Sequence, residues 1–443
     1  MLGRRDVTIG LCSGLLGASL GHASERSDPD GSVLESAYYY GFGPFAMARS
    51  TAIALGQGER ANTFAHRRTL ADHASRTVNT PNNDTLYSSA RYDLSTGPID
   101  IHIPTLTDRY FVVAFMDAFT DNFAMPGTRQ SGGKGGVWRL APHDYRGEAP
   151  EGVTLLRAPT NDGWILARVL VDGDGDLPAA VAAQSKLSVV PLRPGAAGTP
   201  FPIKPGDGTD PANFLATVNM YLGRTRPAGP DFARARRYGP AGIRPGQLDA
   251  WTKISPAMQT NWPAAVARAR ASLLRFGTQR ERIQGWTYPG PGIGEFGDDD
   301  LYRAGVAYLA LSALPRQEAM YVTCGVDAGG ELLRGANRYR LDVPAPGVPA
   351  GAFWSLTMYQ IEPDGRLFLV ENPLRRYAIG DRTSGLVRSS DGGLSIAIQQ
   401  TPPAETSNWL PAPPGQFFVI LRAYRPSDAL LTGRWRMPAI NRV

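Results

Sequence analysis

The stretch GAFWSLTMYQIEPDGRLFLVENPLRRYAIGDRT, residues 351–383, decides which fold the chain is expected to adopt. It begins with the strand-like run FWSLTMYQ, turns at Pro-Asp-Gly and continues in a second strand-like run, LFLVE. Two such runs joined by this turn predict a β-hairpin. Because successive side chains on a strand point to opposite faces, one apolar set is predicted to face a core. This set is Trp354, Leu356 and Met358.

The opposite face of that strand combines a ring, two hydroxyls and a phenol, from Phe353, Ser355, Thr357 and Tyr359. This mixture is typical of ligand-facing sheets, and an ordinary solvent face is the alternative. The following loop carries five charged groups: Glu371, Arg375, Arg376, Asp381 and Arg382. Arginine–carboxylate pairs that brace the loop are one interpretation, and contacts with a polar ligand are the other.

The composition of the whole chain also favours β structure. The 443 residues are 42% hydrophobic and 19% charged, a globular balance that excludes disorder of the chain as a whole. The 50 glycines and 37 prolines favour many turns between short strands. We therefore predict a mainly β fold with helical insertions, in the α+β class.

The patterns predict two β regions separated by a helical one. The first has strands at 85–93, 99–103, 109–117, 137–140, 152–158 and 163–171, then a helix at 177–187. A Pro/Gly-rich linker is predicted at 188–210, with helices near 211–222, 260–276 and 298–313. The second region has strands at 319–326, 337–343, 351–360, 394–400 and 416–424, with a short helix near the end.

Two helices are predicted before the first strand, at 32–56 and 60–75. Three residues should bend or split the earlier helix: Gly41, Gly43 and Pro44. The later helix would place His66 and His73 on one face. Two histidines hold a metal only with a third ligand from elsewhere, so surface histidines are favoured and no metal site is predicted.

The first residues have the pattern of an export signal. Arg4 and Arg5 form a positive segment, an apolar run covers residues 7–20, and small residues follow. We expect cleavage of residues 1–23, so that the mature chain starts near Ser24. The paired arginines resemble a twin-arginine signal. A membrane anchor is the alternative, but the run is shorter than the roughly 20 residues that span a bilayer. A periplasmic or secreted location is predicted.

The distribution of charge and the number of cysteines restrict the possible functions further. The net charge of +6 is concentrated at 221–285, where 12 Lys or Arg stand against 3 Asp or Glu. This excess predicts either a solvated helical face or contact with an acidic partner or anionic ligand. No zinc-finger, RNP-like or basic-heptad pattern accompanies it, so nucleic-acid binding is not expected. Cleavage would leave Cys324 alone, which excludes an intramolecular disulfide and predicts a buried apolar role.

A polar cluster in the first β region resembles the one in the opening stretch. Residues 79–87, NTPNNDTLY, combine amides, a carboxylate and a phenol beside a strand. Turn scaffolding is one interpretation and binding of a polyhydroxylated or amide-bearing ligand is the other. Asp84 and Asp117, with a carboxylate from the second β region, would supply the acid/base pair of glycoside hydrolysis. No fingerprint for a nucleotide or other cofactor is present, and none is predicted.

These segments resemble, in order, a family of exported bacterial proteins that pair domains of unknown function 1254 and 1214. The first match rests on NTPNNDTLYSSARYDLSTGPIDIHIP and RYFVVAFMDAFTDNFA. The second rests on FWSLTMYQ, ENPLRRYAIGDRT, DGGLSIAIQQ and NWLPAPPGQFFVILRAYRP. The resemblance implies two jelly-roll-like β-sandwich domains joined by a helical segment. The family is remotely similar in architecture to enzymes that cleave glycan–asparagine links, a likeness of fold.

Together these observations predict N-terminal helices and a first β-sandwich at 24–187, a linker and helices at 188–315, and a second β-sandwich at 316–443. The expected function is a hydrolase-like activity on a polar or carbohydrate-bearing small substrate; the alternative is a non-catalytic envelope protein that binds a ligand or partner.

Predicted catalytic or orienting residues are Asp84, Asp117, Arg375 and Asp381. Predicted substrate-binding residues are Asn82, Asn83, Tyr87, Trp354, Tyr359, Asn372, Arg376 and Tyr377. No stable membrane insertion is expected after cleavage, and a homo-oligomer is left open.

Overall fold

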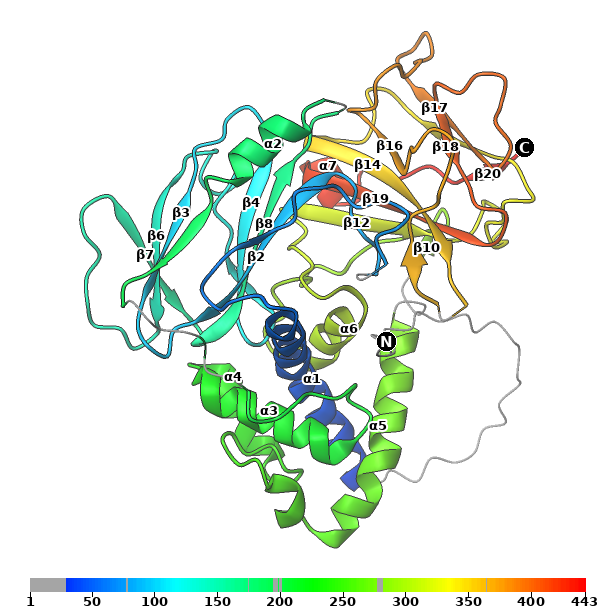
Figure 1. The fold of residues 1–443 in the computed structure, drawn as a ribbon. Helices are drawn as coiled ribbons and strands as arrows, with labels where there is room; N and C mark the ends of the chain where they lie inside the picture. The colour runs from blue at the N-terminus through cyan, green and yellow to red at the C-terminus, as the bar shows by residue number, and fades with distance from the viewer. Residues whose placement is uncertain are drawn as a thin grey trace, which may run out of the picture.

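The computed structural model of this chain describes residues 29–76, 79–173, 175–193, 198, 201–276, 282–363 and 365–443. The predicted export signal at 1–23 lies outside these residues. The described part is mainly β, with the longer helices gathered below the sheets (Figure 1). This agrees with the α+β class predicted from the sequence. The jelly-roll topology and the domain boundaries remain predictions.

The first β region holds two sheets that share a hydrophobic core. A five-stranded sheet has the order β1 (Ala65–His66), β2 (Thr85–Asp93), β8 (Asp162–Leu170), β4 (Phe111–Met116), β5 (Asn122–Ala124). A four-stranded sheet has the order β7 (Val153–Ala158), β6 (Gly136–Pro142), β3 (Ile99–Ile103), β9 (Ser188–Pro191). Alternating apolar side chains of both sheets meet in the core, among them Leu86 and Ile101, and Ala180 of helix α2 (Leu177–Gln184) joins them. Because β9 pairs with β3, the start of the stretch predicted as a linker belongs to this sheet.

The second β region is built in the same way. The larger sheet runs β10 (Arg282–Ile283), β11 (Trp286–Thr287), β12 (Ala319–Cys324), β19 (Phe417–Pro426), β14 (Ala350–Ile361), β15 (Leu367–Phe368), and β16 (Ala378–Gly380) also pairs with β14. The smaller sheet runs β18 (Trp409–Pro411), β17 (Leu394–Gln399), β13 (Tyr339–Val343), β20 (Asn441–Arg442). Helix α7 (Asp428–Leu431) follows β19. The core between the sheets contains Trp354, Leu356 and Met358, as the alternation predicts.

The helical layer consists of α1 (Pro29–Gly56), α3 (Pro211–Thr225), α4 (Pro230–Ala235), α5 (Pro256–Phe276) and α6 (Asp300–Ala310), with short 3-10 turns at Arg236–Tyr238 and Ala250–Lys253. Helix α1 is continuous, so Gly41, Gly43 and Pro44 do not split it. A Cβ at Gly41 would lie 3.0 Å from the ring of Phe214 on α3. The predicted split is therefore wrong, and the glycine instead allows close packing of the two helices.

The helix predicted at 60–75 is wrong. Residues 65–66 form β1, paired with β2, and the flanking residues are turns and irregular chain. His66 and His73 therefore share no helix face. His66 Nδ1 lies 2.8 Å from Ser88 Oγ, and His73 Nδ1 lies 2.9 Å from Tyr377 Oη. Pairing with β2, a long-range contact, overrides the local pattern here. The described residues contain no cluster of metal-ligating side chains.

The two large sheets pack against each other, and this contact positions the candidate site. Tyr110 and Leu170 of the first β region lie in one buried cluster with Phe353, Ala319 and Tyr424 of the second. The rings of Phe353 and Tyr424 are stacked, with centroids 4.2 Å apart. The polar face predicted for β14 is therefore turned toward the first β region, which excludes the solvent-face alternative for it.

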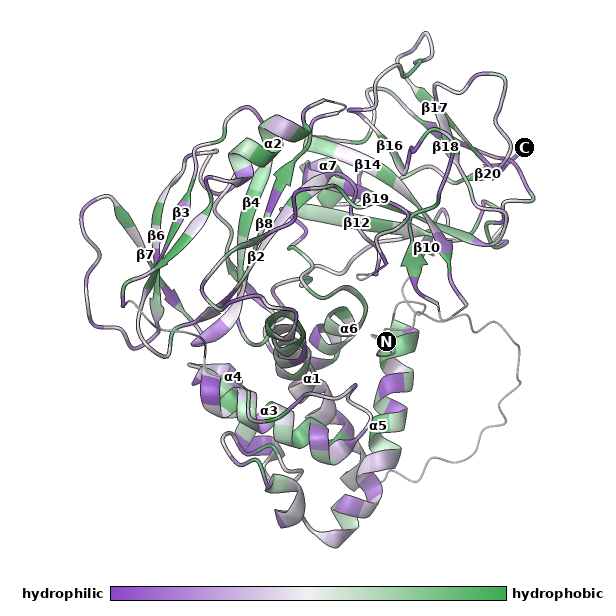
Figure 2. Cartoon of the chain, viewed as in Figure 1, coloured by the Kyte–Doolittle hydropathy of each residue, from purple (hydrophilic) through white to green (hydrophobic). Residues whose placement is uncertain are grey.

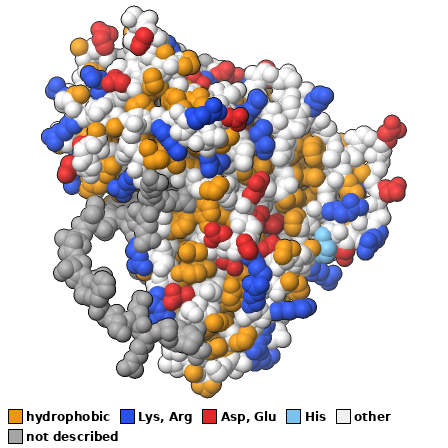
Figure 3. All heavy atoms as spheres, turned by 180° about the vertical axis from the view of Figure 1, so that it is seen from behind, with side chains coloured by type: hydrophobic (Ala, Val, Ile, Leu, Met, Phe, Trp, Pro, Cys, Tyr) orange, Lys and Arg blue, Asp and Glu red, His pale blue; other side chains and the backbone are white. Residues whose placement is uncertain are grey.

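The hydropathy of the elements agrees with this arrangement of sheets and helices. In Figure 2, β4 is green, β14 is paler because polar residues alternate with apolar ones, and α5 carries purple and green patches in turn. Seen from behind, Lys and Arg side chains are spread over the molecule and alternate with Asp and Glu (Figure 3). No described helix is long and apolar enough to cross a bilayer.

Candidate functional site

The predicted site residue Asp84 joins the two β regions. Its backbone N–H donates to the Asn82 side chain at 2.6 Å, a local turn that leads into β2. Asp84 Oδ1 accepts a hydrogen bond from Arg382 Nη2 at 2.8 Å, and Oδ2 accepts one from Ser355 Oγ at 2.6 Å. Because both partners belong to the second β region, this buried carboxylate ties β2 to β14 and to the loop after β16.

Further polar contacts surround this carboxylate. Asn82 Nδ2 donates to Tyr424 Oη at 2.8 Å, and Tyr359 Oη donates to the carbonyl of Pro81 at 2.7 Å. The segment before β2 thus lies directly on β14 and β19. We call the whole set the inter-sheet polar layer. It consists of Asn82, Asp84, Tyr87, Arg168, Tyr321, Ser355, Thr357, Tyr359, Arg382, Arg422 and Tyr424.

Two arginines of the layer are buried without an acidic partner. Arg168 is 4% exposed; its Nη2 donates to the carbonyl of Ser312 at 2.9 Å, and its Nη1 has no described hydrogen-bond partner. Arg422 Nη1 donates to Thr357 Oγ1 at 2.9 Å, and its Nη2 donates to the carbonyl of Thr80 at 3.1 Å. Neither guanidinium forms an ion pair with a described carboxylate. Burying a charged side chain without an ion-pair partner lowers the stability of the fold.

The phenols around these arginines do not balance their charge. Burial raises the pKa of Tyr359 to about 12, and it raises the pKa values of Tyr321 and Tyr424 above the usual range. These side chains are therefore neutral at pH 7. Arg168 stands over the ring of Tyr87, 5.4 Å from the centroid. Tyr87 and Tyr321 are both half-buried, so the layer reaches solvent beside Arg168.

Asp381 lies at the edge of the same layer. One of its carboxylate oxygens accepts from the backbone N–H of Trp354 at 3.2 Å, next to Ser355, which bonds Asp84. Burial raises the pKa of Asp381 to about 6, and the charge of Asp84 contributes to the rise. Two of the predicted catalytic residues, Asp84 and Asp381, are thus brought to adjacent positions of β14.

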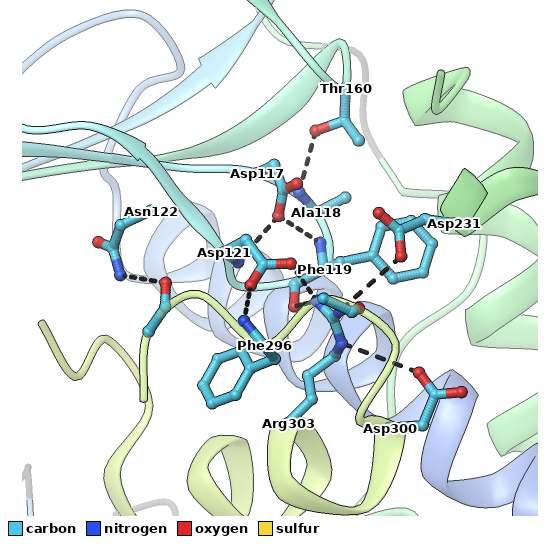
Figure 4. A network of polar contacts seen from close by, with 12 residues as sticks. Asp117, Ala118, Phe119, Asp121, Asn122, Thr160, Asp231, Phe296, Asp300 and Arg303 are labelled. Atoms are coloured by element: carbon cyan, nitrogen blue, oxygen red, sulfur yellow. Dashed lines mark hydrogen bonds and ion pairs between the residues drawn. The ribbon is translucent and has the colours of Figure 1, made fainter. Parts of the chain in front are cut away.

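Asp117, the other predicted catalytic aspartate, belongs to a separate network (Figure 4). Its Oδ1 accepts from the backbone N–H groups of Phe119 and Asp121 at 2.9 and 3.0 Å, so it braces the turn between β4 and β5. Burial first, and then the charge of Asp121, raise the pKa of Asp117 to about 8. The carboxyl is therefore mostly protonated at pH 7. The hydrogen-bond partners of Asp117 and Asp84 differ, so the two carboxylates belong to separate polar networks.

Arg303 on α6 is the centre of this second network (Figure 4). It is fully buried, and Nη1 donates to Asp121 Oδ2 and to the carbonyl of Phe119, both at 2.6 Å. Carboxylate oxygens of Asp231 and Asp300 lie 3.7 and 4.0 Å from the same guanidinium. The network connects the turn after β4 with α4 and α6. It fastens the helical layer to the first β region, which is a structural role.

The predicted site residues of the loop at 371–377 mainly hold that loop and its neighbour. Asn372 Oδ1 accepts from the Arg376 N–H at 3.0 Å, and Nδ2 donates to the carbonyls of Val370 and Arg376. Arg376 Nη1 donates to the carbonyls of Thr406, Ser407 and Trp409, at 2.8, 3.0 and 2.9 Å. Arg375 is exposed. The bracing interpretation therefore describes this loop, although through carbonyl groups rather than carboxylates.

The remaining predicted residues are dispersed. Asn83 Nδ2 donates to the carbonyl of Ala71, and Tyr377 Oη bonds His73, so both fix the segment before β2. Trp354 lies in the core of the second β region and points away from the inter-sheet polar layer. Of the predicted set, the structure brings together Asn82, Asp84, Tyr87, Tyr359 and Asp381.

Arg168 and Arg422 are not among the site residues predicted from the sequence. Each is the only charge within an apolar run of its strand, GWILARVLV at 163–171 and FFVILRA at 417–423. A single arginine in a central strand is a sequence signal, because an unpaired charge is rarely buried without a function or a partner. Tyr321 and Tyr424 carry no comparable signal, since tyrosine is common in strands.

Comparison with known proteins supports the resemblance found in the motifs. A model described as "Protein of unknown function (DUF1254)" matches residues 61–191, and one described as "Protein of unknown function (DUF1214)" matches residues 318–428. The crystal structure of the VPA0106 protein from Vibrio parahaemolyticus is similar, with a TM-score of 0.71 and 24% identity over 94% of this chain and 100% of that chain. That likeness shows the fold alone.

A second solved structure, an uncharacterized protein from Burkholderia cenocepacia, has a TM-score of 0.46 and 12% identity over 94% of this chain and 93% of that chain. Among curated proteins, none matches this chain. The two family models fall on the two β regions, in the order that the motifs predict. The chain belongs to the family of proteins that combine a DUF1254 domain with a DUF1214 domain, both of unknown function.

Proposed function

We propose that this chain is a non-catalytic binding protein that takes up a small oxyanion, a carboxylate, phosphate or sulfate, in the inter-sheet polar layer. The observation that carries the proposal is Arg168. Arg168 is 4% exposed, its Nη1 makes no hydrogen bond of good geometry to a described residue, and its polar neighbours are phenols, among them Tyr321 and Tyr87, of which Tyr87 stabilises the guanidinium. An oxyanion would supply the missing negative charge and accept hydrogen bonds from the N–H groups of Arg168.

The position of the layer supports the same proposal. Ligand sites are common where two domains meet, and here the sheets of both β regions contribute side chains. Tyr87 and Tyr321 are half-buried, so the layer is partly open to solvent at these two rings. Phenol hydroxyls are donors, so they suit an oxyanion as well. Arg422 forms no ion pair with a described carboxylate, although the nearby charge of Asp84 stabilises its guanidinium, and it adds a second positive charge to the layer.

The proposal is tested by ligand-induced stabilisation of the full chain. Phosphate, sulfate and acetate are added separately at constant ionic strength, and the melting temperature is followed. An anion that binds only the folded state stabilises it by about 2.7 kcal/mol at 100 times its Kd. For a chain of this size that is a rise of about 3 °C. The three anions distinguish a phosphate or sulfate ligand from a carboxylate ligand.

Two variants make the test specific. Arg168→Met removes the unpaired buried charge, so we expect no anion response and an unchanged or higher melting temperature in anion-free buffer. Arg139→Met is the control, because Arg139 Nε and Nη2 already bond Asp100 at 2.8 and 2.9 Å within the four-stranded sheet. It should keep the anion response. An equal response in wild type and Arg168→Met would refute the proposal.

A hydrolase acting on a polar or carbohydrate-bearing substrate is the second candidate. Asp381 favours it, because a carboxyl with a pKa of about 6 close to a second carboxyl group, that of Asp84, is the pattern of an acid/base pair. The test is an activity profile of the mature protein with Asp381→Asn as the variant. Turnover that survives this substitution unchanged would eliminate Asp381 as the acid.

Export to the periplasm or beyond is likewise a proposal. It is supported by the charged and apolar pattern of residues 1–23. Cell fractionation of the full chain and of Arg4→Lys/Arg5→Lys tests it. Loss of export in the double variant would identify the twin-arginine route. Recovery of the wild-type chain in the cytoplasm would contradict the proposal.

A further inference from the structure

A groove lies on the outer face of the smaller sheet of the second β region, on the side away from the inter-sheet polar layer. Its volume is about 410 Å³, within the range of small-molecule sites. Side chains of β13 and β17 form its floor, including Arg340, Ser395 and Ala397. Its walls come from the segments around Val387 and Glu405, and Val443 stands at its rim.

The walls of the groove are held by hydrogen bonds from the side chains of Asn408 and Arg376. Asn408 Oδ1 accepts from the Val387 N–H at 2.9 Å, while Nδ2 donates to the carbonyls of Val387 and Ser395 at 2.6 and 3.0 Å. Arg376 fixes the opposite end of the same wall through its carbonyl contacts at residues 406, 407 and 409. The groove is therefore formed in advance, which lowers the entropy cost of binding.

The lining combines apolar surface with two opposite charges. Val387 and Val443 are 61% and 64% exposed, the highest values among the large hydrophobic side chains that the structure describes. Both line this one groove, and covering them would be favourable. Arg340 uses Nε for an exposed pair with Asp342 at 2.8 Å, which leaves four of its five N–H donors. Glu405 is exposed and bonds no described residue.

We infer that this groove binds a short zwitterionic ligand with apolar side chains, such as a hydrophobic dipeptide. Its carboxylate would pair with Arg340, its ammonium group with Glu405, and its side chains would cover Val387 and Val443. Such a ligand would supply a cation for Glu405 and an acceptor for the N–H donors that Arg340 retains beside its pair with Asp342, and it would cover the apolar wall as well. The site is independent of the oxyanion site proposed above.

Calorimetric titration of the full chain with leucyl-leucine tests the inference. We expect binding with a Kd below about 1 mM. N-acetylation or C-amidation of the dipeptide should weaken binding three- to five-fold each, which is about what an exposed ion pair contributes. Equal affinity of the free and the blocked dipeptides would overturn the inference, and so would the absence of binding at 5 mM, about five times that limit.

Three variants assign the contacts. Glu405→Gln should abolish the effect of N-acetylation and keep that of C-amidation, and Arg340→Gln should do the reverse. Both side chains are exposed, so neither substitution threatens folding. Arg168→Met should bind the dipeptide as wild type does, which separates this site from the inter-sheet polar layer. If each of the groove variants left both effects intact, the groove would not be the site.

Discussion

Asp84 and Ser355 are 271 residues apart in the sequence, and their side chains share a hydrogen bond of 2.6 Å. Both are buried, at 4% and 2% exposure, so water cannot replace either partner. The same carboxylate is ion-paired with Arg382, also in the second β region. The segment that carries Asp84 is therefore attached to the second β region by its side-chain contacts. This relationship makes the two β regions dependent on each other.

The first prediction concerns that carboxylate. Asp84→Asn keeps an acceptor for Ser355 but leaves the Arg382 guanidinium without its ion-pair partner. Removing one member of a buried pair costs about 3 kcal/mol or more, so the urea midpoint should fall clearly. Asp108→Asn is the control, since Asp108 is an exposed partner of Arg109 and its loss should cost less than about 1 kcal/mol. Equal midpoints for the two variants would contradict the interface role.

The second prediction concerns pH and Asp117. Its folded-state pKa of about 8 lies above the usual value of 3.8, so the folded protein binds this proton more tightly than the unfolded chain does. The associated stability is complete below about pH 4 and declines as the pH rises through 8, by up to about 1.4 kcal/mol per pH unit. Asp117→Asn removes the titration while its side-chain oxygen can still accept both N–H groups. Unfolding between pH 5 and 9 should therefore show a shallower pH dependence in this variant, and identical slopes would refute the assignment.

The third prediction concerns Gly380, which places the loop that carries Asp381 and Arg382. A Cβ on Gly380 would lie 2.1 Å from the carbonyl oxygen of Trp354, a backbone atom that cannot move aside alone. Gly380→Ala should destabilise the fold by about 2–3 kcal/mol, as overpacking does. Gly415→Ala is the control, because nothing lies within 4 Å of the Cβ it would add. Thermal unfolding compares the two, and a Gly380→Ala protein as stable as the control would count against this packing.

The fourth prediction concerns Cys324, which lies buried in β12. Burial raises the pKa of its thiol to about 12, so almost no thiolate exists near neutral pH. In protein that starts at Ser24, a thiol reagent at pH 8 should therefore modify the folded chain only at the rate of unfolding. Addition of urea should expose one reactive thiol. Rapid labelling of the folded protein would show that this strand opens far more easily than its packing indicates.

Much of the fold could be predicted from local pattern. The strands at 85–93 and 99–103 and the alternation of β14 follow from apolar periodicity and turn residues, which act over a few neighbouring positions. The helix predicted at 60–75 fails for the opposite reason, because pairing of Ala65 and His66 with β2 is decided by residues more than twenty positions away. Local propensity carries no information about such a partner.

The candidate site, like the fold, could be predicted from the sequence only in part. The sequence by itself determined the family, through its long motifs, and it identified Asp84, Tyr359 and Asp381 as polar groups on or beside strands. Only the tertiary structure decided that Asp84 faces Ser355 and Arg382, that Asp117 belongs to the Arg303 network instead, and that Arg168 is buried without an acid. The physical reason is that burial and pairing of a charge depend on which surfaces meet when the sheets pack, and a linear sequence does not state those contacts.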